Sequence, residues 1–453
     1  MAVVKIRTYI QDTLFPFPGH SKFGIGFLCL GLCIGVAVRA GMLWFVDYRF
    51  DGGDTMDYLT RAHNLLEYHI YSGDLNSAPV PSLYRPPFYP FFLAFITWIF
   101  GSNPLYVQMS QLVLSLITAL LITRVTAYLI PMAAPWVFGI MMLSPYEAVY
   151  AGAVLSESIT TFLLVAAASA ILTMEGLKRW MIGGVLLGLC VLTRDVYLPL
   201  VLLIAGCWIV LGKGTRRSRS LDAAVLVLSA CLVILPWTLR NYSVTKRFVP
   251  VSEGRLGFSL WMGTWATNGA FTAGDAVDQR VYPPEAFRSQ AEKEFVDNAL
   301  EQGISKAEPI FRSLAVQRIY DEPFAVLGTY LIREPLLWLG TRFDIFILNA
   351  KWFPRNSHLW RAVKAVLWGG NFLLMLLGIA GIVLAWRLRN SVLVLVLPLL
   401  YTALVYFPLN SFENRYSQPV YPFVLVFAGI AAARLADKLN RTRQGGNKLW
   451  QMT

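Results

Sequence analysis

The stretch GIGFLCLGLCIGVAVRAGMLWFVDYRFDGGDTMD, residues 24–57, joins a long apolar run directly to a group of acidic side chains. The run over residues 23–46 contains one charged side chain, Arg39, and is long enough for a helix that crosses a lipid bilayer. Because the acidic residues begin where the run ends, the sequence predicts a membrane helix that ends against a negatively charged surface. These acidic residues are Asp47, Asp51, Asp54 and Asp57.

The whole chain has the composition of a multi-pass membrane protein. Of its 453 residues, 56% are hydrophobic and 15% are charged, whereas ordinary soluble domains carry about 25% charged residues. The apolar segments predict an all-α polytopic fold, in which residues 179–211 form either two spans or one broken helix. The predicted spans are 23–46, 105–130, 133–150, 153–174, 180–193, 196–211, 221–237, 363–386, 391–409 and 417–435.

The formal net charge of +12 is spread over short loops between the apolar segments. Basic loops of this kind stay on the cytoplasmic side of the inner (plasma) membrane, so the charge pattern predicts a topology and argues against a nucleic-acid partner. The predicted divisions are a cytoplasmic N-terminus (1–22), an N-terminal transmembrane module (23–237) with an external loop (47–104), an external, periplasmic region (238–362), C-terminal membrane helices (363–436) and a basic cytoplasmic tail (437–453).

Two apolar stretches in the external parts are interrupted by charged or aromatic residues. Residues 84–101 read YRPPFYPFFLAFITWIFG, which is short for a span and predicts a helix lying in the membrane interface. Residues 334–353 read EPLLWLGTRFDIFILNAKWF and predict a second, amphipathic interfacial helix at the end of the external region.

Asp54 has two interpretations from its local sequence. It follows the Gly52-Gly53 break and precedes an apolar helical face, so it either caps that helix, with Asp57 at the third helical position, or belongs to a functional site. Further polar residues at the predicted external ends of other spans favour a site, since ionisable groups near hydrocarbon usually mark function or paired structure. Those residues are Arg85, Glu157, Arg194, Asp195, Arg240, Asn241, Glu413 and Arg415.

Six short motifs occur in an order that resembles a known enzyme family, the GT-C glycosyltransferases that use polyprenyl-phosphate sugars. Within that superfamily the chain is similar to the protein O-mannosyltransferases and the lipid A aminoarabinose transferase. The motifs are Asp54 with Tyr58 and Ala62, Arg85-Pro86-Pro87, Pro145 through Glu157, Leu192-Thr193-Arg194, Pro236-Trp237 with Arg240-Asn241, and Glu413 with Arg415, Tyr416, Pro419 and Pro422.

The resemblance implies a GT-C fold of about ten to thirteen transmembrane helices and transfer of a sugar to a cell-envelope acceptor on the external membrane face, with inversion. It implies that Asp54 is the general base and that Glu157 either orients the acceptor or shares a divalent metal ion with Asp54. The implied donor-phosphate ligands are Arg85, Arg194, Arg240 and Arg415, and the implied substrate-binding residues are Tyr58, Tyr84, Glu413 and Tyr416.

The donor implied by the resemblance is already activated, so no nucleotide is needed, and neither a GxGxxG nor a P-loop motif is present. Thr55 follows Asp54 where the two named subfamilies carry Glu, so the sequence assigns neither the sugar nor the acceptor, which is a glycolipid, a polysaccharide or a protein hydroxyl. The alternative function is a lipid or glycolipid transporter or flippase. A transporter is expected to place charges near mid-membrane in paired, inverted halves, which this pattern does not show.

Overall fold

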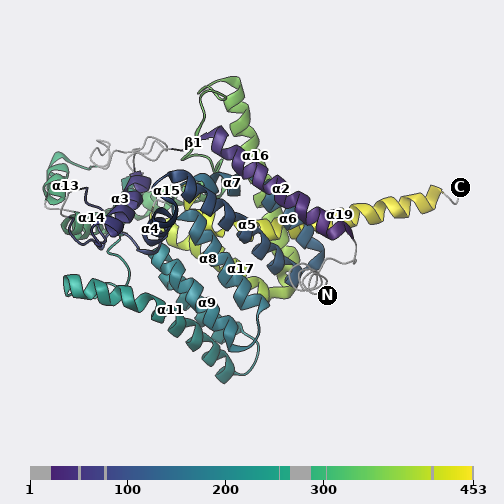
Figure 1. Ribbon diagram of the computed structural model, residues 1–453, viewed down its shortest axis with the longest axis horizontal. Coiled ribbons are helices and arrows are strands. Elements are labelled where there is room, and N and C mark those ends of the chain that lie inside the picture. Colours follow the sequence, from purple (N-terminus) through teal and green to yellow (C-terminus); the bar gives the residue numbers. More distant parts are fainter. Residues whose placement is uncertain are drawn as a thin grey trace.

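The computed structural model describes residues 22–48, 53–75, 79–254, 256–265, 287–301, 304–409 and 413–450 (Figure 1). These residues are almost entirely helical, which confirms the predicted all-α class. Within the described part of the chain, the only sheet is a pair of two-residue strands. Asp51 and residues 1–21 of the predicted cytoplasmic N-terminus lie outside the described residues.

Seven of the described helices are long and apolar enough to cross a membrane. Each coincides with a predicted span, because an uninterrupted apolar run of about 20 residues satisfies its backbone only as a helix in lipid. These helices are α2 (Lys22–Phe45), α5 (Pro104–Leu129), α9 (Gly176–Thr193), α11 (Arg216–Thr245), α16 (His358–Ala385), α17 (Arg389–Tyr406) and α19 (Tyr421–Trp450).

Four shorter apolar helices of 10–17 residues complete the apolar part of the described structure. Two of them, α8 and α10, coincide with predicted spans, and α4 coincides with the predicted interfacial helix. The span predicted over residues 133–150 is instead divided at Ser144 into α6 and α7 (Pro145–Gly152). Residues 179–211 form two helices, because α9 ends at Thr193 and the 3₁₀ turn η3 (Asp195–Tyr197) precedes the next helix. The four are α4 (Phe88–Phe100), α6 (Ala134–Leu143), α8 (Glu157–Thr173) and α10 (Leu198–Leu211).

Glycine allows the closest helix contacts in this bundle. A Cβ added to Gly184 of α9 would lie 2.3 Å from the Leu226 carbonyl oxygen of α11, and one added to Gly381 of α16 would lie 1.8 Å from the Phe427 carbonyl oxygen of α19. Small residues let membrane helices approach through their backbones, where packing replaces the hydrophobic effect as the driving force. We therefore attribute the tight α9–α11 and α16–α19 pairs to these two positions.

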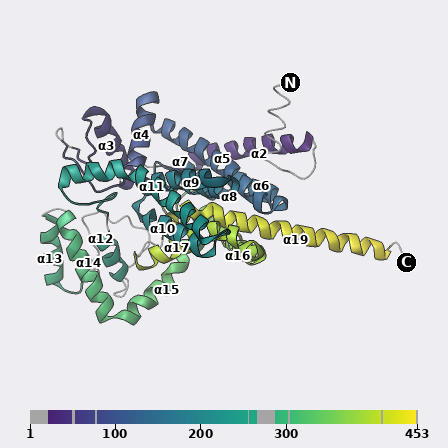
Figure 2. The same cartoon turned by 90° about the horizontal axis from the view of Figure 1, so that it is seen from below.

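Several of the remaining helices lie at one end of the bundle, whereas α7 lies in its middle. Figures 1 and 2 place α3, α4, α13 and α14 at one end of the long axis, whereas the C-terminal part of α19 extends beyond the bundle at the other end. The remaining helices are α3 (Gly53–Glu67), α7 (Pro145–Gly152), α12 (Leu256–Trp265), α13 (Gln290–Glu301), α14 (Ile304–Asp321), α15 (Pro323–Leu339) and α18 (Asn414–Ser417).

The helix predicted over residues 334–353 is only partly correct. Helix α15 ends at Leu339, and Arg342 then adopts a left-handed backbone conformation with φ of 59°. Strand β2 (Ile347–Leu348) follows and pairs antiparallel with β1 (Val46–Asp47), directly after the first span. Tertiary pairing with β1 therefore replaces the helical pattern that the apolar residues predicted.

Candidate active site

Asp54 lies in the first turn of α3, which begins at Gly53 with φ of 58°. Its Oδ1 accepts a hydrogen bond from Arg85 Nη2 at 2.5 Å, and its Oδ2 accepts one from Arg415 Nη2. The interpretation of Asp54 as a residue that precedes and caps the helix is therefore wrong. Both carboxylate oxygens instead bind arginines from distant parts of the chain.

Glu157 lies at the first position of α8, and its side chain is only 1% exposed. Its Oε1 lies 3.1 Å from Nη1 of Arg194, the residue that follows α9, and 3.3 Å from Nε of Arg415. Arg415 thus lies between two carboxylates, Asp54 and Glu157. The structure brings together five of the residues that the sequence nominated.

Two further charged residues of α3 join these five. Asp57 Oδ2 accepts a hydrogen bond from Arg85 Nε at 2.8 Å, and Asp57 Oδ1 lies 3.0 Å from Nη2 of Arg61. From the sequence, Asp57 is expected only at a helix cap, and Arg61 is not among the predicted site residues. The signal that predicts the Asp57–Arg61 pair is their spacing of four residues, which places both on one helix face.

These contacts form a single series of alternating charges, which we call the charge chain. It contains four guanidinium groups and three carboxylates, and Glu413 at 3.8 Å from Arg415 is a fourth carboxylate beside it. Its guanidinium groups are suited to bind an anion such as a phosphate. Its members come from α3, the loop before α4, the start of α8, the end of α9, and α18. In order, they are Arg61, Asp57, Arg85, Asp54, Arg415, Glu157 and Arg194.

Arg240, nominated as a phosphate ligand, has different partners. Its Nη1 donates to the carbonyl oxygen of Ser82 at 2.9 Å, and its guanidinium lies 4.7 Å from the ring centre of Trp237 and 5.7 Å from that of Tyr71. These contacts hold the loop that leads to Arg85. The geometry therefore favours a supporting position for Arg240 over direct membership of the charge chain.

The nominated tyrosines surround the arginines of the charge chain. Arg85 lies 5.3 Å from the ring centres of both Tyr58 and Tyr84. Tyr416 lies 5.2 Å from Arg415 and 5.5 Å from Arg194. Aromatic faces attract guanidinium groups electrostatically, so the tyrosines restrict where the arginines can move.

Glu413 is the most exposed of the nominated acidic residues, with a side chain that is 53% exposed. Its Oε2 lies 3.8 Å from Arg415 Nε, at the margin of an ion pair. Partial burial beside the charge chain raises the pKa of Glu413 above its ordinary value, and the nearby Arg415 opposes this change. Glu413 therefore lies beside the charge chain but is held by it less firmly than Glu157.

The electrostatic environment of Asp54 favours its ionised form. Burial by itself would raise the pKa of Asp54, but Arg415 and Arg85 oppose it and together hold that pKa well below its usual range. Asp54 is consequently a carboxylate at any physiological pH. While both arginines are bound to it, however, it is a weak proton acceptor.

The residues nominated for a divalent metal ion do not fit that role. Asp54 and Glu157 are both engaged by Arg415, which places positive charge where a cation would have to bind. Among the residues that the structure describes, no group of three or more His, Cys, Asp or Glu side chains is arranged to hold a metal ion. Hard cations need several oxygen ligands, and this arrangement supplies arginines instead.

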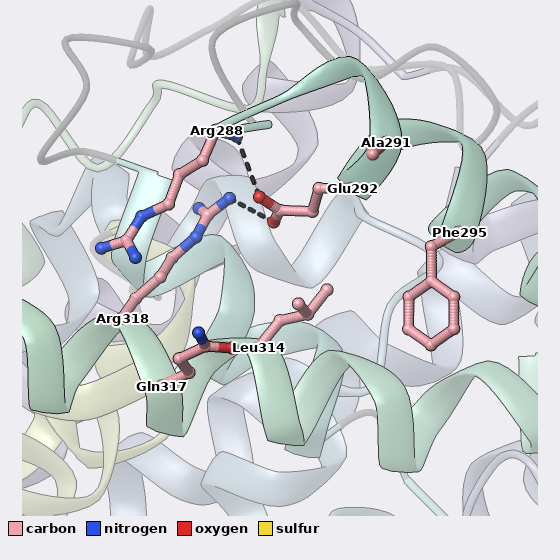
Figure 3. Close-up of a pocket in the computed structure, with 7 residues that line it drawn as sticks. All are labelled: Arg288, Ala291, Glu292, Phe295, Leu314, Gln317 and Arg318. Carbon is pink, nitrogen blue, oxygen red and sulfur yellow. Dashed lines mark hydrogen bonds and ion pairs between the residues drawn. The ribbon is translucent and has the colours of Figure 1, made fainter.

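A separate cavity of about 340 Å³ lies between α13 and α14 (Figure 3). Arg318 Nη2 donates to Glu292 Oε1 at 2.5 Å, and the Arg288 backbone N–H donates to Glu292 Oε2 at 2.9 Å. None of the residues nominated from the sequence is among its lining residues. These lining residues are Arg288, Ala291, Glu292, Phe295, Leu314, Gln317 and Arg318.

Comparison with known proteins returned structural neighbours only. No family model and no curated protein matches the chain. The chain is similar to the crystal structure of ArnT from Cupriavidus metallidurans bound to undecaprenyl phosphate, with 14% identity, a TM-score of 0.39, and coverage of 92% of this chain and 79% of that one. The apo state of the same protein gives 14% identity, a TM-score of 0.40, and coverage of 91% and 78%.

With 14% identity and TM-scores of 0.39 and 0.40, this similarity carries no argument about the activity of the chain. The chemistry proposed below therefore rests on the charge chain.

Proposed function

We propose that this protein is an integral-membrane glycosyltransferase. It moves a sugar from a polyprenyl-phosphate donor to a hydroxyl group of a cell-envelope acceptor, with inversion at the anomeric carbon. The observation that carries this proposal is that Asp54 is bound by both Arg85 and Arg415, with Glu157 and Arg194 adjoining them. A carboxylate and several guanidinium groups in one place supply the two things that this reaction needs, a base and cations for the leaving phosphate.

The arginines of the charge chain are suited to the phosphate of the donor and of the lipid product. A guanidinium forks onto two phosphate oxygens and stays charged at all relevant pH values. The side chains of Arg85 and Arg415 are 18% and 17% exposed, so they are mostly shielded but open to a ligand. Their positive charge stabilises the phosphate as the bond from the sugar to its oxygen breaks and that oxygen takes the electron pair.

Asp54 is the proposed general base. As the acceptor oxygen forms its bond to the anomeric carbon, the acceptor proton passes to the Asp54 carboxylate. When the donor phosphate takes hydrogen bonds from Arg85 and Arg415, these arginines hold Asp54 less strongly, and the pKa of Asp54 rises toward its ordinary value. Donor binding thus converts a weak base into a competent one. Glu157 keeps Arg194 and Arg415 in place during the step.

The membrane arrangement follows from the same proposal. The charge chain lies on the external side, where the loop of residues 47–104 and the region of residues 238–362 meet the bilayer, and the basic C-terminal tail lies in the cytoplasm. The donor's polyprenyl chain then occupies the bilayer, and the acceptor arrives from the cell envelope. This places the reaction away from the cytoplasmic nucleotide sugars.

The test is Asp54→Asn in purified protein reconstituted in lipid, with Glu292→Gln as the matched control from the α13–α14 cavity. Transfer from undecaprenyl-phosphate-linked mannose, glucose and arabinose derivatives to envelope extracts is measured for each. We expect Asp54→Asn to lose at least about 100-fold in turnover, as removal of a general base does, while undecaprenyl phosphate still binds. Glu292→Gln is expected to keep its activity. Unchanged transfer by Asp54→Asn would overturn the assignment.

A further inference from the structure

Arg342 is a buried arginine that the proposed chemistry does not use. It is 0% exposed, and its backbone lies in the left-handed region that non-glycine residues rarely adopt. Among the described residues, no carboxylate lies within ion-pair distance of it. The nearest carboxylate that its contacts reach is the buried Glu147, whose Oε1 accepts a hydrogen bond from Gln418 Nε2 at 2.8 Å, while Gln418 Oε1 accepts from Arg342. Burying a guanidinium without a directly paired carboxylate and straining the backbone both cost free energy, so this arrangement calls for an explanation.

All the described hydrogen bonds of Arg342 go to one short segment, residues 414–418. Its backbone N–H donates to Asn414 Oδ1 at 2.9 Å, and its Nη1 donates to Ser417 Oγ at 3.2 Å. Its Nε and Nη2 donate to Gln418 Oε1 at 3.1 and 2.8 Å, and Nη2 also reaches the Asn414 carbonyl oxygen at 3.3 Å. The guanidinium lies 3.8 Å from the ring centre of Tyr421.

This segment contains Arg415. Helix α18 is only four residues long, Asn414–Ser417, and a helix of one turn has little stability of its own. The end of α15 holds it from another side, because Asn414 Nδ2 donates to the Leu336 carbonyl oxygen at 2.5 Å and Ser417 Oγ donates to the Leu337 carbonyl oxygen at 2.6 Å. The residues flanking Arg415 are therefore fixed by Arg342 and by α15.

We propose that Arg342 is a positioning residue, which holds α18 so that Arg415 can bridge Asp54 and Glu157. This inference rests on the proposed function, in which Arg415 binds the donor phosphate. Arg415 must reach carboxylates on α3 and α8 simultaneously, so a shift of about 1 Å in α18 is enough to break one of these contacts and weaken the site. A charged side chain with several fixed donors is suited to hold a segment that has few internal hydrogen bonds.

The test is a double-mutant cycle that measures the affinity for undecaprenyl phosphate in purified, detergent-solubilised protein. The variants are Arg342→Gln, Arg415→Gln and the double variant. The matched control is Arg39→Gln, because Arg39 is also buried (1% exposed), donates to neutral groups and faces the same Glu147 that Gln418 contacts, but it lies on α2 and has no hydrogen bond to residues 414–418. Thermal unfolding of each variant shows whether Arg342→Gln and Arg39→Gln are destabilised alike.

We expect Arg415→Gln and Arg342→Gln each to weaken binding by about tenfold or more, and the double variant to bind no more weakly than Arg415→Gln alone. Arg39→Gln and Arg415→Gln should instead combine additively. If Arg342→Gln does not fold, Gln418→Ala takes its place, because it removes two acceptor bonds of the same guanidinium.

The possible outcomes separate this inference from the proposed function. Normal binding by Arg415→Gln would contradict the phosphate-binding role of Arg415, and with it the proposed function. Weak binding by Arg415→Gln, together with normal binding by Arg342→Gln or with additive effects in the double variant, would overturn the role of Arg342 alone.

Discussion

The molecule contains two clusters of arginines and carboxylates, and they differ in how they are built. The charge chain joins residues as far apart as Asp54 and Arg415, which are separated by 361 positions, and its Glu157 is 1% exposed. The cluster beside the α13–α14 cavity joins residues within 34 positions, and Arg288 pairs there with Asp321 and Glu322, which are 42% and 45% exposed. Its Arg318–Glu292 pair is buried, at 2% and 11% exposed, so the exposed pairs of this cluster are those of Arg288. Both contain short, well-formed ion pairs.

The difference between the two clusters shows what ion pairs can and cannot indicate. Exposed pairs between neighbouring helices contribute about 0–1 kcal/mol and are common on protein surfaces. Buried charges gathered from five parts of a membrane protein carry a large desolvation cost, which their mutual attraction only partly offsets. The charge chain as a whole therefore adds little to the stability of the fold, and this favours a functional role for it.

The largest expected effect is on stability. Glu157→Ala leaves Arg194 and Arg415 without their shared, buried partner, so we expect a loss of about 3–5 kcal/mol in the free energy of unfolding. Glu322→Ala, its counterpart in the other cluster, should cost less than about 1 kcal/mol. Chemical denaturation in detergent measures both. Equal losses for the two variants would remove the distinction between the clusters.

A smaller effect is expected on ligand binding. Arg85→Gln removes a guanidinium that contacts both Asp54 and Asp57, and we expect it to weaken binding of undecaprenyl phosphate by about tenfold, as loss of one charged hydrogen-bond donor does. Arg288→Gln, in the other cluster, is expected to bind as the wild type does. Titration of both variants with the lipid decides the matter, and weaker binding by Arg288→Gln would point to the α13–α14 cavity instead.

A further effect, confined to acidic solution, is a dependence of stability on pH. The pKa of Asp54 is lowered in the folded protein, so its ionisation stabilises the fold above the unfolded-state pKa of about 3.9, and this contribution is lost as pH falls through the lower, folded-state value. The difference in unfolding free energy between wild type and Asp54→Asn should therefore be constant from about pH 7 to pH 5 and shrink below about pH 4. A difference that shrinks between pH 7 and pH 5 would show that Arg85 and Arg415 do not hold Asp54.

Several features of the site could be anticipated from single residues. Asp54, Arg85, Glu157, Arg194 and Arg415 each follow or precede an apolar segment, so their positions at helix ends were predictable. The contribution of Arg61 was not anticipated, although its spacing from Asp57 was visible in the sequence. Arg240 was nominated by its motif, but its backbone partners in the loop after α3 depend on how that loop folds back.

The sequence by itself determined the all-helical membrane class and the approximate position of each span. Hydrophobicity along a run of about 20 residues is a local property, and in lipid it leaves the backbone only the helix. Tertiary structure alone decided that α15 stops at Leu339, that Arg342 holds α18, and that Arg415 meets Asp54 and Glu157. Those contacts depend on how helices far apart in the chain pack together, and neither local composition nor spacing specifies which side chains will then meet.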